Sequence, residues 1–221
     1  MKRKILLSLF IIVCLLTVGC GKKENKKEEL KLKDGWEINL SIKEVEMPKE
    51  AKDVFNRAND KNYEVVALLG TQVVAGTNYM FLVKDDTSYK IIVVYNNLED
   101  KSTIIHTNNF DFTKYVNERI DYNSSDNVGG WEVYEQPINY LPNEKVQQIF
   151  DDATATMDIV CSPIALLGHQ ENSGTNYAIL TYCGYENVVD KQIKLLTVYE
   201  DLHGTRQIVS SAYVNLSEYN K

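Results

Sequence analysis

The sequence contains few cysteines, prolines and histidines, with four, four and three among its 221 residues. It also lacks an apolar run after Val18 that reaches the roughly 20 residues of a membrane-spanning helix. Residues 35–221 are poor in positive charge. Residues 1–34 hold nine of the 24 basic and four of the 31 acidic residues, which leaves 15 basic against 27 acidic ones. Because nucleic-acid binding needs a basic surface, nucleic acid is excluded as a partner.

Short catalytic and metal-binding motifs are missing too. The sequence has no Gly-Lys-Ser/Thr phosphate loop and no Gly-x-Ser-x-Gly elbow. Its three histidines, His106, His169 and His203, do not show the spacing of a metal pair. A thiol–imidazole pair of Cys161 with His169 or His106 is the remaining catalytic arrangement, and it has no third group to orient it. We therefore expect no enzyme activity, no metal and no cofactor.

The first 20 residues have the layout of an export signal. Basic residues 2–4 precede an uncharged apolar run, residues 5–18, which is too short to span a bilayer. The run ends in LTVGC, which resembles a bacterial lipobox, where cleavage precedes a cysteine that takes a diacylglycerol. We expect residues 1–19 to be a signal peptide and Cys20 to be lipidated, which anchors the protein to the outer face of the cell membrane. A plain secretory signal and a short uncleaved anchor are the alternatives.

The exported part is a duplication. Both tryptophans are followed by glutamate, at residues 36–37 and 131–132, and residues 67–72 (ALLGTQ) recur as residues 165–170 (ALLGHQ). The run GTNY stands at residues 76–79 and again at residues 174–177. The offset between the copies drifts only from about 95 to 104, because the loops differ in length. The segments we expect are a lipidated, charged tether at 20–34, a first domain at 35–117, a linker at 118–128 and a second domain at 129–221.

Each copy predicts the same order of elements. Alternating apolar residues from Trp36 to Ile42 indicate a strand, and Pro48 then opens a helix. The apolar stripe of that helix is Ala51, Val54, Phe55 and Ala58, and the second copy has Val146, Ile149, Phe150, Ala153 and Met157. Four strand-like runs follow in the first copy, at residues 63–71, 77–84, 89–95 and 102–112. We therefore expect an α+β chain of two tandem domains, each with one helix packed on a curled antiparallel sheet of about five strands.

The cysteines left after export form one pair. Cys14 leaves with the signal and Cys20 takes the lipid, so that only Cys161 and Cys183 remain. In an oxidising compartment two such cysteines indicate a disulfide. A hairpin turn centred on residue 172 places Cys161 directly opposite Cys183, at a distance that a disulfide spans.

The hairpin after the first helix carries a more specific pattern. Residues 72–76 read QVVAG, and they resemble the Gln-x-Val-x-Gly signature of the cystatin family of cysteine-protease inhibitors. The following TNY, residues 77–79, is similar to what stefins carry there. The resemblance covers both copies, about residues 35–221. It implies a cystatin-like domain in each copy, which plugs the cleft of a papain-like protease with three parts: a glycine-bearing N-terminal trunk, the first hairpin and the second hairpin.

Carried over residue by residue, the resemblance implies one strong and one weak site. The first copy has Gly35 before its first strand and Gln72, Val73, Val74, Ala75 and Gly76 in its first hairpin. The second copy has the trunk glycines Gly129 and Gly130, and it keeps Gln170 and Gly174, but Glu171 and Asn172 make its tip polar. Neither second hairpin has the tryptophan of many cystatins.

A second interpretation stays open for these residues. Glutamine and glycine also persist in a hairpin whose turn needs a positive φ and a side-chain hydrogen bond. Both copies would then be non-inhibitory binding or adhesion modules on the cell surface, since a fold does not fix a function.

Overall fold

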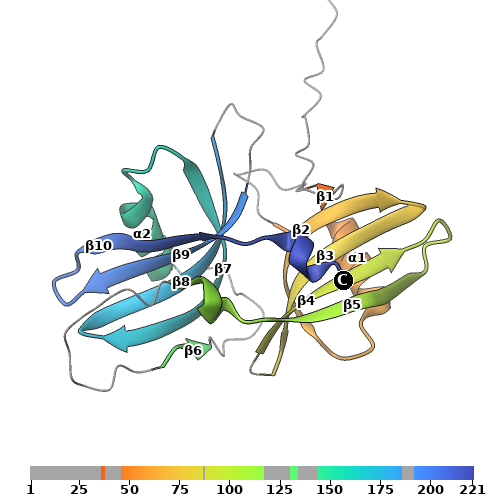
Figure 1. Cartoon of the computed structure of the whole chain (residues 1–221), viewed down its shortest axis with the longest axis horizontal. Helices are drawn as coiled ribbons and strands as arrows, with labels where there is room; N and C mark the ends of the chain where they lie inside the picture. Colours follow the sequence, from red (N-terminus) through yellow and green to blue (C-terminus); the bar gives the residue numbers. More distant parts are fainter. Residues whose placement is uncertain (1–35, 38–45, 87, 117–129, 134–143, 186–191) are drawn as a thin grey trace, which may run out of the picture.

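The computed structural model describes residues 36–37, 46–86, 88–116, 130–133, 144–185 and 192–221. Two sheets, two α-helices and two 3₁₀ turns make up the described part of the chain (Figure 1). The elements of the first copy are β1 (Trp36–Glu37), α1 (Lys49–Ala58), β2 (Glu64–Val74), β3 (Gly76–Asp85), β4 (Ser88–Asn96), β5 (Ser102–Phe110) and η2 (Phe112–Tyr115). Those of the second copy are β6 (Glu132–Val133), α2 (Glu144–Thr154), β7 (Val160–Asn172), β8 (Gly174–Gly184), β9 (Gln192–Asp201), β10 (Arg206–Tyr213) and η3 (Leu216–Tyr219).

The predicted order of elements in each copy is confirmed, with shifted ends. In α1 all four residues of the predicted stripe are buried. The helix α2 ends at Thr154, so Met157 lies beyond it and does not belong to its stripe as predicted. The strand β5 ends at Phe110, two residues early, because Asp111 turns the chain by accepting a hydrogen bond from the backbone N–H of Thr113. Of the predicted first strand, only Trp36 and Glu37 lie within the described residues.

The strands form two antiparallel five-stranded sheets. The order is β1-β2-β3-β4-β5 in the first sheet and β10-β9-β8-β7-β6 in the second. Neighbours in sequence are therefore neighbours in space, as a meander requires. The prediction of an α+β chain built from two helix-on-sheet domains is nevertheless wrong, because the structure is mainly β. The two helices have 10 and 11 residues, whereas eight of the strands have 8 to 13 residues each.

The error concerns what the sheets pack against. The largest apolar cluster draws on both copies, including Leu69, Met80 and Leu82 from the first and Leu167 and Leu180 from the second. It lies between the two sheets. The helices cover the opposite faces, where α1 contacts Phe81 and Ile92. Each sheet is thus buried on both faces. The copies share the core between the sheets, and each copy also has a smaller apolar cluster under its own helix.

The strand sequences explain this burial. In β3 the consecutive residues Met80, Phe81, Leu82 and Val83 are all fully buried. Because successive side chains of a strand point to opposite faces, Met80 and Leu82 enter the core between the sheets while Phe81 and Val83 face the helix. An unbroken apolar run is typical of a strand that is covered on both sides. The runs in β3 and β8 therefore indicated a second cover, which the sequence-based prediction overlooked.

Each copy also reaches across to the other through its last turn. The turn η2 of the first copy contacts β10, and η3 of the second copy contacts β5, as Figure 1 shows for the green and dark blue turns. The turns extend the repeat, since Asp111 and Asn215 cap them in the same way. Tyr115 and Tyr219 occupy equivalent positions, and their hydroxyls form a hydrogen bond of 2.9 Å. The two copies thus contact each other reciprocally through equivalent turns.

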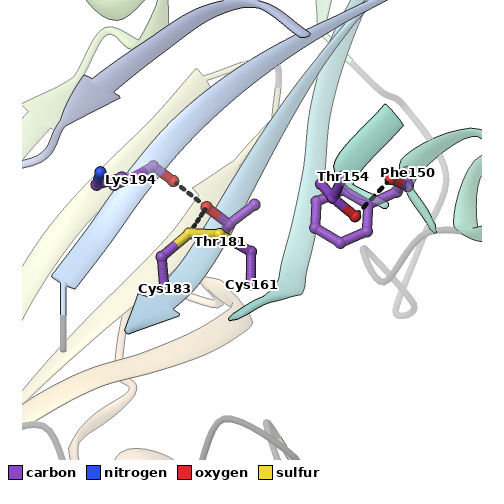
Figure 2. The surroundings of a disulfide bond; sticks show 6 residues. All are labelled: Phe150, Thr154, Cys161, Thr181, Cys183 and Lys194. Atoms are coloured by element: carbon purple, nitrogen blue, oxygen red, sulfur yellow. Dashed lines mark hydrogen bonds between the residues drawn. A yellow bond between two sulfur atoms is a disulfide. The ribbon is translucent and has the colours of Figure 1, made fainter. Parts of the chain in front are cut away.

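The predicted disulfide is confirmed. Cys161 on β7 and Cys183 on β8 are bonded, and their Cα atoms are 4.1 Å apart. The reasoning about the turn was off by one residue, since the hairpin turns at Ser173, where Asn172 pairs with Gly174. Two bulges, at Ile164 and Leu167, each shift the register by one and bring the cysteines opposite each other. Figure 2 shows the surroundings, where the hydroxyl of Thr181 donates to the carbonyl of Lys194 (2.9 Å) and lies 3.3 Å from the sulfur of Cys183.

Removing this disulfide is expected to lower the free energy of unfolding measurably. In the chain-entropy model a bond that closes a loop of this length contributes on the order of 3 kcal/mol. Replacing both Cys161 and Cys183 with serine should therefore lower the urea midpoint of residues 35–221. Wild-type protein in reductant is the matched control and should lose the same amount. Free alkylation of both thiols in oxidised, folded protein would contradict the assignment.

Candidate functional site

The hairpin between β2 and β3 ends in an exposed apolar tip. Ala75 is the one residue between the two strands, and Val73 and Val74 precede it with 75% and 44% of their surface exposed. Elsewhere in the described residues, apolar side chains of this size are mostly buried. We call residues Val73, Val74 and Ala75 the apolar tip.

The backbone of this hairpin is fixed by glycine and tyrosine. Gly76 has a φ of +128°, and a Cβ atom on it would come within 2.4 Å of the carbonyl oxygen of Asn96 and 2.9 Å of the Tyr95 ring. Only glycine fits at this position. The Tyr95 hydroxyl donates a hydrogen bond to the carbonyl of Ala75. The tip is therefore held in one conformation before any partner binds, which lowers the entropy lost on binding.

Gln72 also has a structural task. Its side-chain oxygen accepts a hydrogen bond of 2.8 Å from Asn78, which lies directly across the hairpin. The second copy repeats this pair, with 3.1 Å between Asn176 and Gln170. Gly174 has a φ of +149°. The Tyr199 hydroxyl donates to the carbonyl of Ser173 over 2.9 Å.

The two hairpins therefore share a scaffold and differ at the tip. The glutamine and the glycine of the predicted signature are required by the hairpin in both copies. Where the first copy exposes Val73 and Val74, the second has Glu171 and Asn172, and Thr175 donates a hydrogen bond of 3.3 Å to the Glu171 carboxylate. The apolar tip is the part of the signature that the architecture of the hairpin does not explain.

A second exposed apolar residue lies beside the tip. The turn between β4 and β5 projects Leu98, which is 86% exposed. Asn97 shapes this turn by accepting hydrogen bonds from the backbone N–H groups of Glu99 and Lys101, both at 2.9 Å. The two turns are adjacent, since a Cβ atom on Gly76 would also approach Asn97 to 3.1 Å. Leu98 was not among the predicted site residues, although a leucine among polar turn residues was a visible signal.

The matching turn of the second copy has the same design. Leu202 is also exposed there. Asp201 accepts hydrogen bonds from the backbone N–H groups of Thr205 (2.7 Å) and His203 (2.8 Å). These bonds, first of all the one from Thr205, hold the pKa of the Asp201 carboxyl below its ordinary value.

The start of each copy lies next to its first hairpin. In the first copy, Trp36 of β1 pairs with Gln72 and Glu37 pairs with Thr71. Trp36 thus lies opposite Gln72, the residue that precedes the apolar tip. Gly35 itself lies outside the described residues, as do Gly129 and Cys20. Gly130 is described and exposed, and a Cβ atom there would have no neighbour within 4 Å, so packing does not require glycine at this position.

In the first copy, the helix α1 is hydrogen-bonded to a strand of the hairpin. The hydroxyl of Tyr79 on β3 donates to the carboxylate of Glu50 on α1 over 2.9 Å. Burial, and then this hydrogen bond to Glu50, raise the pKa of Tyr79 to about 12. In the second copy Tyr177 donates instead to Glu200, a residue of β9, over 3.4 Å.

The thiol–imidazole pair considered in the sequence is not formed. Cys161 is bonded to Cys183, and His169 lies on β7 with its Nε2 atom 3.5 Å from a carboxylate oxygen of Glu132. Within the described residues, no group of three or more histidine, cysteine or acidic side chains is arranged to hold a metal ion. No helix in the same part of the chain is long and apolar enough to cross a membrane.

Comparisons with known proteins add no relative. The chain matches no family model, and no curated protein is significantly similar to it.

Proposed function

We propose that the exported part of this protein inhibits papain-like cysteine proteases, and that the first copy does so by inserting its apolar tip into the active-site cleft. The lipid on Cys20 would hold the inhibitor at the outer face of the cell membrane. The observation that carries the proposal is the exposure of Val73 and Val74 on a hairpin whose glutamine–asparagine hydrogen bond is present in both copies. A rigid apolar projection is a costly feature on a protein surface unless a partner covers it.

The surroundings of the tip support the proposal. The family that the tip resembles plugs its target with three parts, and three corresponding parts lie at one end of the first sheet. They are the start of β1 at Trp36, the hairpin with the apolar tip, and the turn with Leu98. A cleft could thus bury Val73, Val74 and Leu98 together, and each fully buried side chain of this size contributes about 1.5–3 kcal/mol.

The mechanism that follows is occlusion without chemistry. The side chains of the apolar tip, Val73, Val74 and Ala75, carry no electrophile for the protease cysteine, and the tip would exclude substrate from the cleft without forming a bond. Excess inhibitor should therefore protect the protease thiol from iodoacetamide, and full activity should return after dilution. The experiment uses residues 35–221 at up to 100 times the concentration of each of several papain-like enzymes. Inhibition that survives dilution, or a stable covalent adduct, would contradict occlusion.

The alternative, a non-inhibitory binding module, is favoured by a different observation. The shared hydrogen bonds of Gln72 and Gln170 account for the signature glutamine without any target. Under this alternative, no enzyme of the panel is inhibited and the thiol is alkylated at the uninhibited rate.

A further inference from the structure

The outer edge of β5 is open along part of its length. Within the described residues β5 pairs only with β4, and it forms one edge of the first sheet (Figure 1). Its nine residues contain no proline, lysine, arginine or carboxylate. Such an edge offers unpaired backbone groups to an added strand, and proteins usually protect edges with those residue types. Asn108 donates a hydrogen bond of 2.9 Å to the carbonyl of Tyr219. The turn η3 therefore covers the C-terminal end of the β5 edge, and residues 102–107 form the part of the edge that it does not cover.

A groove runs along this open stretch. It has a volume of about 610 Å³ and lies between the C-terminal end of α1 and residues 102–107 of β5. Ile105 lines it and is 44% exposed, because it is the extra residue of a bulge opposite Val93 and Val94. The groove provides room for the side chains of a strand that pairs with the edge.

The charge along the groove is mostly positive. Arg57 and Lys61 line it together with Asp60. Arg57 interacts electrostatically with Asp53, one turn earlier in α1, but the hydrogen bonds of its guanidinium go to uncharged partners, Ser102 (3.3 Å) and Asn96 (3.4 Å). An excess of positive charge along a groove is unusual in residues 35–221, which contain 27 acidic and 15 basic residues.

In the second copy, ion pairs connect the helix and the edge strand at the corresponding position. Arg206 of β10 stands where β5 has Ser102, and its guanidinium bonds to Asp152 of α2 and, over 3.1 Å, to Glu200 of β9. The helix of the second copy is thus tied to its edge strand by opposite charges. In the first copy β5 contains no lysine, arginine or carboxylate, so that no such ion pair ties it to α1.

We propose that the β5 edge of the first copy binds an extended, acidic peptide segment of another protein. The peptide adds as a sixth strand over residues 102–107, and alternate side chains enter the groove, where a carboxylate meets Arg57 and Lys61. The bulge at Ile105 interrupts the edge and limits the segment to about five residues. A second copy of this chain fits less well, because its own Arg57 and Lys61 would approach those of the first.

The test uses two blocked heptapeptides, one of alternating valine and glutamate and one with lysine in place of glutamate. We expect the glutamate peptide to shift the backbone amide signals of residues 102–107 in ¹⁵N-labelled protein and to bind at least about tenfold more tightly than its lysine twin. Ile105→Glu should abolish this binding, because it removes an apolar contact and repels the carboxylates of the peptide. Val209→Glu changes the corresponding bulge residue of β10 and should leave the binding unchanged.

Three results would overturn the proposal. They are equal binding of both peptides, shifts that map to another strand, and concentration-dependent shifts of residues 102–107 without peptide, which would mean that a second copy covers the edge. The proposal is independent of protease inhibition. Peptide binding should therefore survive changes at the apolar tip.

Discussion

Replacing Val74 with aspartate is expected to abolish inhibition of a papain-like protease while leaving the protein folded. The change removes an apolar side chain from the proposed contact and would bury an unpaired carboxylate in the cleft. A loss of several kcal/mol is expected for such a group at the centre of an interface, which is at least about a hundredfold in the inhibition constant. Because Val74 is exposed in the free protein, its substitution should change the free energy of unfolding by only about 0.5 kcal/mol.

Asn172→Asp is the matched control for this experiment. It places the same carboxylate at the corresponding position of the second copy, where Asn172 pairs with Gly174 at the polar tip. Inhibition should not change. If both substitutions weaken inhibition equally, or if Val74→Asp has no effect on an enzyme that the wild type inhibits, then the apolar tip is not the contact.

A buried charge between the sheets is expected to destabilise both copies at once. Leu180 of β8 is 1% exposed and belongs to the core that the two sheets share. Leu180→Asp would place a carboxylate there without a partner, at a cost of about 4 kcal/mol or more. Since domains of this size are stable by about 5–15 kcal/mol, a large fraction of the protein should unfold in mild urea.

Hydrogen exchange distinguishes a shared core from two separate cores. In the Leu180→Asp variant, the amides of Leu69, Met80 and Val93 in the first sheet should exchange faster, although the substitution is in the second copy. Tyr185→Asp, on an exposed residue after β8, is the control and should change little. Normal protection of the first sheet in the Leu180→Asp variant would mean that the copies are stable independently.

The local elements were predictable from the sequence because their signals are local. The apolar stripe of α1 and the Pro48 that precedes it predicted the helix. The short polar segments between the strand-like runs predicted the hairpins. The disulfide was predicted for a partly wrong reason. Two bulges compensated for a misplaced turn, and bulges such as those at Ile164 and Leu167 leave no clear mark in a sequence.

The packing of one copy on the other was not predicted, although part of its signal was present. The apolar run at residues 80–83 fits a strand that is buried on both faces, yet it does not say what lies on the second face. The contact between Tyr115 and Tyr219 joins residues 104 positions apart, and only the tertiary structure brings them together. At the candidate site, the sequence identified the hairpin signature. It could not show that the glutamine and the glycine of this signature stabilise the hairpin, whereas Val73 and Val74 are exposed.

The most direct test of the proposed function is an exchange of the two tips within intact residues 35–221. One variant gives the first copy the polar tip, with Val73→Glu, Val74→Asn and Ala75→Ser, and a second gives the second copy the apolar tip, with Glu171→Val, Asn172→Val and Ser173→Ala. Both copies stay present in each variant because they share a core. The measurement is the inhibition constant against a papain-like enzyme that the wild type inhibits. We expect the first variant to lose inhibition by at least about a hundredfold and the second to keep it. Undiminished inhibition by the first variant would contradict the proposal.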